Sequence, residues 1–106
     1  MQQFLYKLEL VRGDMLQTGP TPAEQSAVAE HFAYLQELTA KGVVILVGRT
    51  LTIDKNTMGL AIFQAESEDA ARQIMNGDPA VRKGVMTATL FPFKVALQGK
   101  QNSSQP

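Results

Sequence analysis

The single histidine of this 106-residue chain, His31, is the first candidate for chemistry, because histidine changes charge near neutral pH. It lies in a segment with the pattern of an amphipathic helix, and a spacing of about 100° per residue places it near the middle of the apolar arc. A histidine there is either a packed residue bonded to backbone or a general base that reaches a pocket. Position alone leaves both interpretations open.

Asp78 is the second candidate, since a carboxylate beside a histidine can orient the imidazole and stabilise its charged form. It follows the predicted helix end Asn76-Gly77 and precedes Pro79, an arrangement that also caps a short helical turn. Asp78 is therefore either a capping residue or the partner of His31, and geometry has to decide between them.

Arg49 is the third candidate, as a residue that binds an anionic substrate. It ends a predicted strand directly after Gly48, and its guanidinium can fork onto a carboxylate or phenolate. The same position also suits a solvated charge at the edge of a sheet. Arg82 and Lys83 are weaker candidates, because they fall on a short turn that is expected to be exposed.

The rest of the composition excludes several classes of protein. With no cysteine and one histidine, one chain can form neither a thiolate site nor a multi-histidine metal site. No glycine-rich phosphate loop follows a predicted strand, so we expect no metal and no cofactor. Ten basic and ten acidic residues balance, which argues against nucleic acid and anionic membranes as partners. The N-terminus lacks a secretory signal and no apolar run could span a membrane, so we expect a cytoplasmic protein.

Hydrophobic patterning predicts four strands and two helices. The first strand alternates apolar and polar residues with period two. Thr21 and Glu24 have the spacing of a capping box at the start of the first helix, and Lys41-Gly42 ends it. The second strand, 43–47 continuing to Arg49, is expected to be buried. The other predicted segments are strands 4–11, 58–65 and 86–97, a loop over 12–22, a second helix capped by Ser67, and a short turn over 79–83.

The order β-α-β-β-α-β predicts an α+β, ferredoxin-like unit in which two helices cover one face of a four-stranded antiparallel sheet. Pro92 cannot donate to a ladder, so the last strand should lie at an edge or carry a bulge. The first strand has apolar residues on both faces, with Leu5 on one and Phe4, Tyr6 and Leu8 on the other. Because two helices cover one face, we expect a homodimer or higher homo-oligomer through the other.

The RNA-recognition motif has the same order of elements but does not fit this chain. It carries stacking aromatic residues on its third strand where this sequence has Leu60 and Ala65. We therefore expect one ferredoxin-like domain over residues 1–97 that binds a small-molecule ligand and no nucleic acid. A polar tail over 98–106 is expected to be flexible.

Three segments, taken in order, resemble the YciI-like, or YCII-related, family. The first is the helical sequence HFAYLQEL at 31–38, which runs into Lys41-Gly42 and a hydrophobic strand. The second runs from SEDAAR at 67–72 to NGDP at 76–79. The third is VRKG at 81–84, followed by a strand that contains FPF. The likeness covers roughly residues 4 to 97.

The resemblance implies a dimeric α+β barrel and a His–Asp pair as the active site, matched here by His31 and Asp78. Chemistry in the wider family includes dehydrochlorination of a chlorinated hydroxyhydroquinone. The chain departs from the family pattern at Arg49, where a proline often follows the glycine, and at Ala80, where an aromatic residue often follows Asp-Pro. Both departures concern the identity of the substrate.

Two functions are therefore expected. The first is a small cofactor-free enzyme of the lyase or isomerase type, in which His31 abstracts a proton from a cyclic or aromatic substrate and Asp78 orients it. The alternative is a non-catalytic module that binds a small ligand or a protein, since ferredoxin-like units serve many functions. The geometry around His31 separates the two.

Overall fold

The computed structural model describes residues 1–100, so part of the predicted tail, 101–106, lies outside the described residues. No helix of the described chain is long and apolar enough to cross a membrane. The chain runs in order through β1 (Gln2–Leu10), α1 (Met15–Thr18), α2 (Pro22–Ala40), β2 (Val44–Arg49), β3 (Gly59–Ala65), α3 (Glu68–Gly77), α4 (Pro79–Arg82) and β4 (Met86–Phe93).

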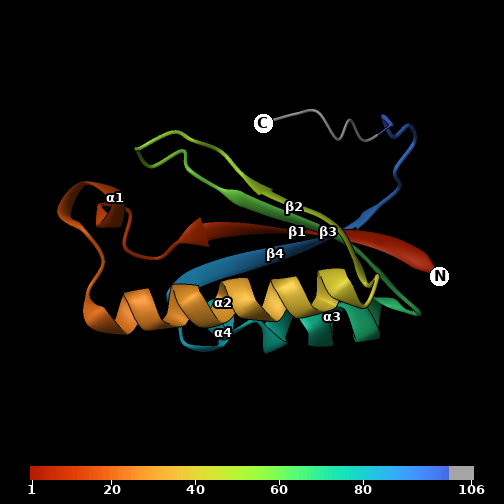
Figure 1. The fold of residues 1–106 in the computed structure, drawn as a ribbon, viewed down its shortest axis with the longest axis horizontal. Helices are drawn as coiled ribbons and strands as arrows, with labels where there is room; N and C mark the ends of the chain where they lie inside the picture. The colour runs from red at the N-terminus through yellow and green to blue at the C-terminus, as the bar shows by residue number, and fades with distance from the viewer. Residues whose placement is uncertain (101–106) are drawn as a thin grey trace.

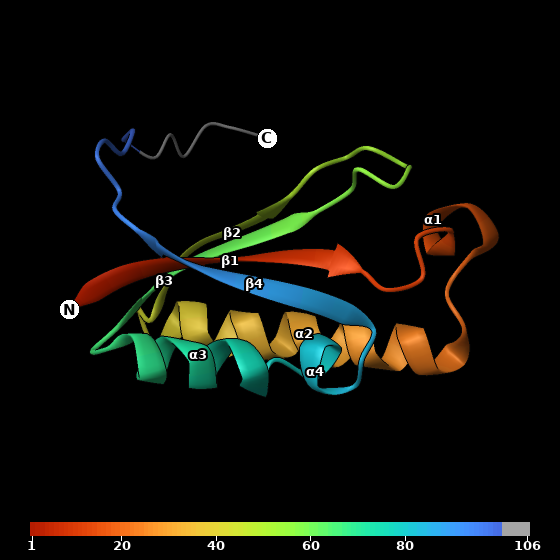
Figure 2. The same cartoon turned by 180° about the vertical axis from the view of Figure 1, so that it is seen from behind.

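The four strands form one antiparallel sheet in the order β2-β3-β1-β4, so β1 and β3 are central strands. Helices α2, α3 and α4 lie against one face of this sheet, in a single layer (Figure 1, and from behind in Figure 2). The chain therefore has the predicted α+β, ferredoxin-like arrangement. Pro92 lies in β4 at an edge of the sheet, as its missing N–H predicted.

The main helices begin and end where the sequence indicated. Thr21 accepts a hydrogen bond from the backbone N–H of Glu24, whose side chain accepts from the N–H of Thr21 in return. Ser67 caps α3 by accepting from the N–H of Ala70. Gly42 follows α2 with a φ of +78°, a left-handed conformation that glycine adopts without strain. These caps set where α2 and α3 begin and where α2 ends.

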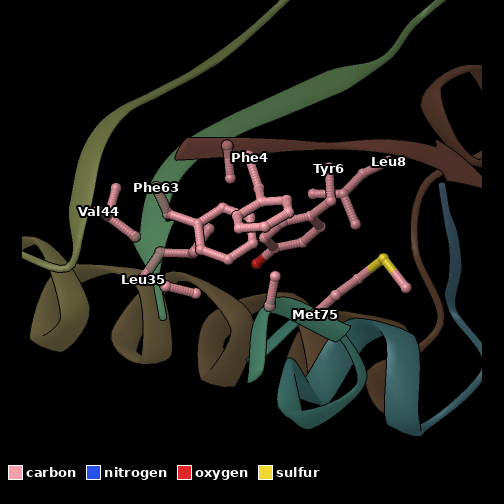
Figure 3. Packing of buried hydrophobic residues seen from close by; sticks show 10 residues of the cluster. Phe4, Tyr6, Leu8, Leu35, Val44, Phe63 and Met75 are labelled. Atoms are coloured by element: carbon pink, nitrogen blue, oxygen red, sulfur yellow. The ribbon is translucent and has the colours of Figure 1, made fainter. Parts of the chain in front are cut away.

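Aromatic rings between the sheet and the helices form the centre of the core (Figure 3). The ring of Phe63 lies 6.0 Å from that of Phe4, centroid to centroid. It lies 5.5 Å from the ring of Tyr6, edge to face at 86°. Leu35 of α2 and Met75 of α3 close this layer from the helix side. The helix-facing side of β1 is thus a tightly packed base for the site described below.

The second strand, predicted to be buried, is mostly exposed, and that prediction was wrong. Val44 is buried, but Leu46 is 55% exposed. Two features explain the difference. The strand lies at an edge of the sheet, and a β-bulge interrupts its pairing, because Val44 pairs with Phe63 whereas Leu46 pairs with Ile62.

Three further details differ from the sequence expectation. The short helix α1 interrupts the loop predicted for 12–22. The last strand ends at Phe93, because the backbone N–H of Val95 donates to the side chain of Gln3 instead of continuing the ladder. Phe32 is 60% exposed although helical spacing predicts it on the apolar arc, since it lines a cleft rather than the centre of the sheet.

The face of the sheet away from the helices carries an apolar row. Residues paired across antiparallel strands share a face. The register places four apolar residues side by side across the sheet, namely Leu46, Ile62, Leu5 and Phe91. This row is the physical basis of the expected homodimer, which stays a prediction.

Candidate active site

His31 and Asp78 are in direct contact. The Nδ1 atom of His31 lies 2.7 Å from Oδ1 and 2.8 Å from Oδ2 of Asp78. His31 belongs to α2, and Asp78 occupies the junction between α3 and α4. Since an ionised carboxylate only accepts hydrogen bonds, Nδ1 carries the hydrogen and donates it to Asp78. The lone pair of the imidazole is then on Nε2, on the other side of the ring.

The carboxylate of Asp78 is fully buried and surrounded by donors. Besides His31, the backbone N–H of Ala80 donates to Oδ1 at 3.0 Å. The hydroxyl of Tyr6 donates to Oδ2 at 2.8 Å. The contact with Ala80 is the helix cap that the sequence predicted for α4, with Pro79 in the first helical position. The same carboxylate therefore caps α4 and contacts His31, so the two alternatives coexist.

The interruption between α3 and α4 directs Asp78 toward α2. The third helix ends at Gly77, and Asp78 adopts an extended backbone with φ −63° and ψ 124°. Pro79 disfavours helical geometry in the residue before it, which explains why the helix does not continue. Next to the break, the hydroxyl of Tyr34 donates to the carbonyl of Ile74 at 2.7 Å and ties α2 to α3.

Tyr6 is a site residue that the sequence interpretation missed. The sequence places it only among the apolar residues on one face of the first strand, and its ring is fully buried. A hydroxyl on the core-facing side of a central strand needs a buried partner, and that requirement is the signal that pointed to a polar group nearby. Burial, followed by the charge of Asp78, raises the pKa of Tyr6 far above its usual range. The phenol therefore remains a neutral donor.

A cleft of about 760 Å³ opens beside His31. The side chain of His31 is 13% exposed, whereas Asp78 lies behind it and is fully buried. Most of the lining is apolar and includes Leu10, Met15, Val28, Phe32 and Val47. The polar side chains of the lining are those of His31, Arg49, Gln25 and Thr57. The cleft thus combines an apolar interior with a few polar groups, as small-molecule sites do.

Arg49 lies on the cleft side of β2. It pairs with Gly59 of β3. Alternate residues of a strand share a face, and Ala61, two positions after Gly59, is fully buried on the face that the helices cover. Arg49 therefore lies on that same face. Both Arg49 and Gly59 line the cleft. Gly59 has no side chain, and the side chain of Leu8 from the next strand lies beside it, 3.5 Å from the point that a Cβ atom would occupy. Arg49 is exposed, the described residues give it no ion pair, and the lining of the cleft contains no acidic side chain.

The wall of the cleft formed by α1 is held in place by Arg12. Its Nε and Nη2 atoms lie 3.0 Å and 2.7 Å from the two carboxylate oxygens of Glu24. Its remaining donors reach the hydroxyl of Thr18 at 2.8 Å and the carbonyl of Gly19 at 2.7 Å. The hydrogen bond from Arg12, followed by that from the backbone of Thr21, lowers the pKa of Glu24 to about 2. The donors of Arg12 are therefore engaged within the chain.

These contacts make the site suited to acid–base chemistry. A supported imidazole lies at the wall of an apolar cleft that also contains a guanidinium group. Within the described part of the chain, no three histidine, cysteine or acidic side chains gather as a metal site requires.

Comparison with known proteins gives one family match and several similar structures. Residues 10–94 match the family described as the YCII-related domain. No curated protein sequence matches the chain. The 5-chloro-2-hydroxyhydroquinone dehydrochlorinase TftG from Burkholderia phenoliruptrix, solved with 2,5-dihydroxybenzoquinone, is 26% identical with a TM-score of 0.65. That similarity covers 87% of this chain and 93% of TftG.

Two other structures show the fold alone. Muconolactone isomerase is 12% identical with a TM-score of 0.65, over 97% of this chain and 99% of that one. The de novo designed protein Ferredog-Diesel is 13% identical with a TM-score of 0.50, over 84% of this chain and 83% of that one. An enzyme and a designed protein thus share this architecture, so the fold does not specify a reaction.

Proposed function

Because the chain belongs to the YCII-related domain family, we propose that it is a small-molecule enzyme in which His31 and Asp78 act together as a general base. The observation that carries this proposal is the contact of 2.7 Å between Nδ1 of His31 and the buried carboxylate of Asp78. The imidazole lies at the wall of a cleft of about 760 Å³. A histidine held in this way has one nitrogen fixed and the other available to a ligand.

The proposed reaction begins when the substrate transfers a proton to Nε2 of His31. Asp78 holds the tautomer with hydrogen on Nδ1 before the transfer and stabilises the imidazolium afterwards. General base catalysis of this kind contributes about 10²- to 10⁴-fold to the rate. The electron pair left on the substrate either expels a halide ion or takes the proton back at another atom. Both routes balance without an oxidant or a reductant, so we propose no cofactor.

The substrate that fits this cleft is cyclic or aromatic and carries an anionic oxygen. The apolar lining suits a planar ring. Arg49 is the cation of the lining, and its guanidinium matches a carboxylate or a phenolate. We therefore propose that Arg49 binds the anionic group while His31 removes a proton from the same ring.

The likeness to TftG supports elimination as the reaction to test first, since that enzyme is a dehydrochlorinase. The purified protein is mixed with 5-chloro-2-hydroxyhydroquinone under anaerobic conditions, and chloride release is followed over time. We expect His31→Ala and Asp78→Asn each to lower the rate by about 10²- to 10⁴-fold. Glu30→Gln is the matched control, because Glu30 precedes His31 on α2 but pairs with Lys83 at the surface.

The apolar cleft also fits the alternative function, a non-catalytic module that binds a small hydrophobic ligand. Thermal unfolding with 2,5-dihydroxybenzoquinone as the ligand separates the two functions. If this compound stabilises the wild type and His31→Ala equally, and neither releases chloride from the chlorinated compound, the enzyme proposal is wrong for this substrate class and binding is favoured.

A further inference from the structure

Tyr6 is a buried polar residue to which the proposed base assigns no role. It belongs to β1, a central strand of the sheet, and its side chain is fully buried. The edge-to-face contact with Phe63 at 5.5 Å holds the plane of its ring. The hydroxyl oxygen points from the sheet toward the helix layer (Figure 3). A rigid strand therefore delivers one hydroxyl group to the carboxylate of Asp78.

The donors on Asp78 are divided between its two oxygens. The backbone N–H of Ala80 binds Oδ1, and the hydroxyl of Tyr6 binds Oδ2. Nδ1 of His31 lies within 2.8 Å of both oxygens, so it faces the middle of the carboxylate. Without the hydroxyl, Oδ2 would keep only the contact with His31, and the carboxylate would be held from the helix side alone, by Ala80 and His31. Tyr6 thus supplies the contact that holds the carboxylate from the sheet side.

The hydroxyl also withdraws negative charge from the carboxylate that faces His31. Because the pKa of Tyr6 is raised by burial and by Asp78, the phenol remains protonated and donates throughout the neutral range. Burial, followed by the charge of Asp78, also raises the pKa of Tyr34 of α2. The charged groups nearby are the pair of Lys83 with Glu30, the residue before His31, and Arg49, which lines the same cleft as His31. A carboxylate that accepts a third hydrogen bond attracts the imidazolium less strongly than one with two.

We propose that Tyr6 is a positioning residue, which orients Asp78 and lowers the pH at which His31 takes up its proton. This role rests on the proposed function, because a positioning residue is defined here by the base, His31, of that reaction. The effect on His31 itself does not depend on any substrate. Tyr6 therefore acts through Asp78 and touches no ligand.

The chain offers a direct measurement, because it contains a single histidine and its imidazole signals are unique. The imidazole ¹⁵N resonances are followed by NMR across the pH range in the wild type and in Tyr6→Phe, without ligand. Phenylalanine keeps the ring against Phe63 and removes only the hydroxyl. We expect the titration midpoint of His31 to rise by about half a pH unit or more, a threefold or greater gain in proton affinity.

Tyr34→Phe is the matched control, since Tyr34 is the second of two tyrosines in the chain. Its hydroxyl donates to the carbonyl of Ile74 and not to Asp78. Removing it should leave the His31 midpoint within about 0.2 pH units of the wild type. An equal shift in both variants would mean that the change comes from loosened packing, and it would overturn the role of Tyr6.

A second measurement tests the direction in which the Tyr6 hydroxyl moves the His31 titration midpoint, without deleting the hydroxyl. Incorporation of 3-fluorotyrosine into the Tyr34→Phe variant labels Tyr6 alone and makes its hydroxyl a stronger donor. We expect the His31 midpoint to fall by a few tenths of a pH unit, opposite to the change in Tyr6→Phe. A rise, or no change in either variant, overturns the proposal. This measurement also serves if Tyr6→Phe does not fold.

The test of Tyr6 can fail or succeed independently of the test of the proposed function. If the midpoints move as expected but no variant differs in chloride release, Tyr6 tunes His31 and the proposed reaction is wrong. If His31→Ala abolishes chloride release while Tyr6→Phe leaves both the midpoint and the pH profile of kcat/KM unchanged, the reaction stands and the role of Tyr6 fails.

Discussion

The hydroxyl of Tyr34 lies 3.0 Å from the point that a Cβ atom on Gly77 would occupy. That hydroxyl cannot move away freely, because it donates to the carbonyl of Ile74 at 2.7 Å. Gly77 directly precedes Asp78 and is the last residue of α3. The close fit between α2 and α3 at this point therefore bears on where the buried carboxylate lies.

The first prediction concerns Gly77→Ala in two backgrounds. In a helix, alanine is more favourable than glycine by about 0.5–1 kcal/mol. In Tyr34→Phe, where the obstructing hydroxyl is gone, we expect Gly77→Ala to be stabilising by about this amount. With Tyr34 present, the contact should cancel or reverse the gain. Urea unfolding of the four proteins measures a coupling that we expect to be about 1 kcal/mol. Additive effects of the two substitutions would contradict this fit.

The second prediction concerns the acid dependence of stability. The pKa of Glu24 is lowered from 4.5 to about 2, chiefly by the hydrogen bond from Arg12. Because the folded-state pKa is depressed, the pair stabilises the fold above about pH 4.5, and this contribution is lost as the pH falls toward 2. We expect the urea midpoint of the wild type to fall more steeply over this window than that of Glu24→Gln. Glu37→Gln, from an exposed surface pair, is the control.

The third prediction concerns the charge of the ligand. Arg49→Ala should weaken binding of 2,5-dihydroxybenzoquinone by about 10- to 100-fold, because it removes charge-assisted hydrogen bonds. Arg49→Lys keeps the charge but loses the fork, so we expect an intermediate loss. Isothermal titration calorimetry measures both affinities, with Arg72→Ala on the exposed face of α3 as the control. Wild-type affinity in Arg49→Ala would identify Arg49 as a surface residue.

The fourth prediction concerns assembly. Phe91 is 43% exposed and lies in the apolar row on the face of the sheet opposite the helices. We expect the wild type to be a homodimer at micromolar concentration and Phe91→Glu to be a monomer of 11.6 kDa with unchanged circular dichroism. Phe32→Glu, on the helix side, should not alter the mass. Sedimentation equilibrium measures all three, and a monomeric wild type would sink the dimer prediction.

The architecture could be predicted because local signals agreed with the global pattern. The box formed by Thr21 and Glu24 marks the start of α2, Gly42 marks its end, and Pro92 indicates an edge strand. These signals depend on a few neighbouring residues, which a sequence displays directly. The pairing of His31 with Asp78 needed more, because 47 positions separate them. Their residue types left the contact as one of two alternatives, and the resemblance to a family favoured it.

The remaining features depend on how distant elements pack. A tyrosine among apolar core residues gives no hint of which carboxylate it meets, so the bond from Tyr6 to Asp78 was missed. The exposure of β2 was also missed, because a run of aliphatic residues is typical of buried strands and carries no sign of a bulge. Periodicity identifies strands, whereas strand order and register come from the assembled sheet.

The bulge at Ile45 makes two surfaces of the molecule interdependent. Beyond this extra residue the strand is shifted by one position, so Leu46 joins the outer apolar row and Arg49 faces the cleft. A strand without the bulge, in which Ile45 itself paired with Ile62, would exchange the two faces beyond that point. Arg49 would then carry its charge into the outer row, while Leu46 would turn inward. A change in the register of this strand would therefore alter the lining of the cleft and the outer apolar row together, whereas substitutions within the strand can alter either one alone.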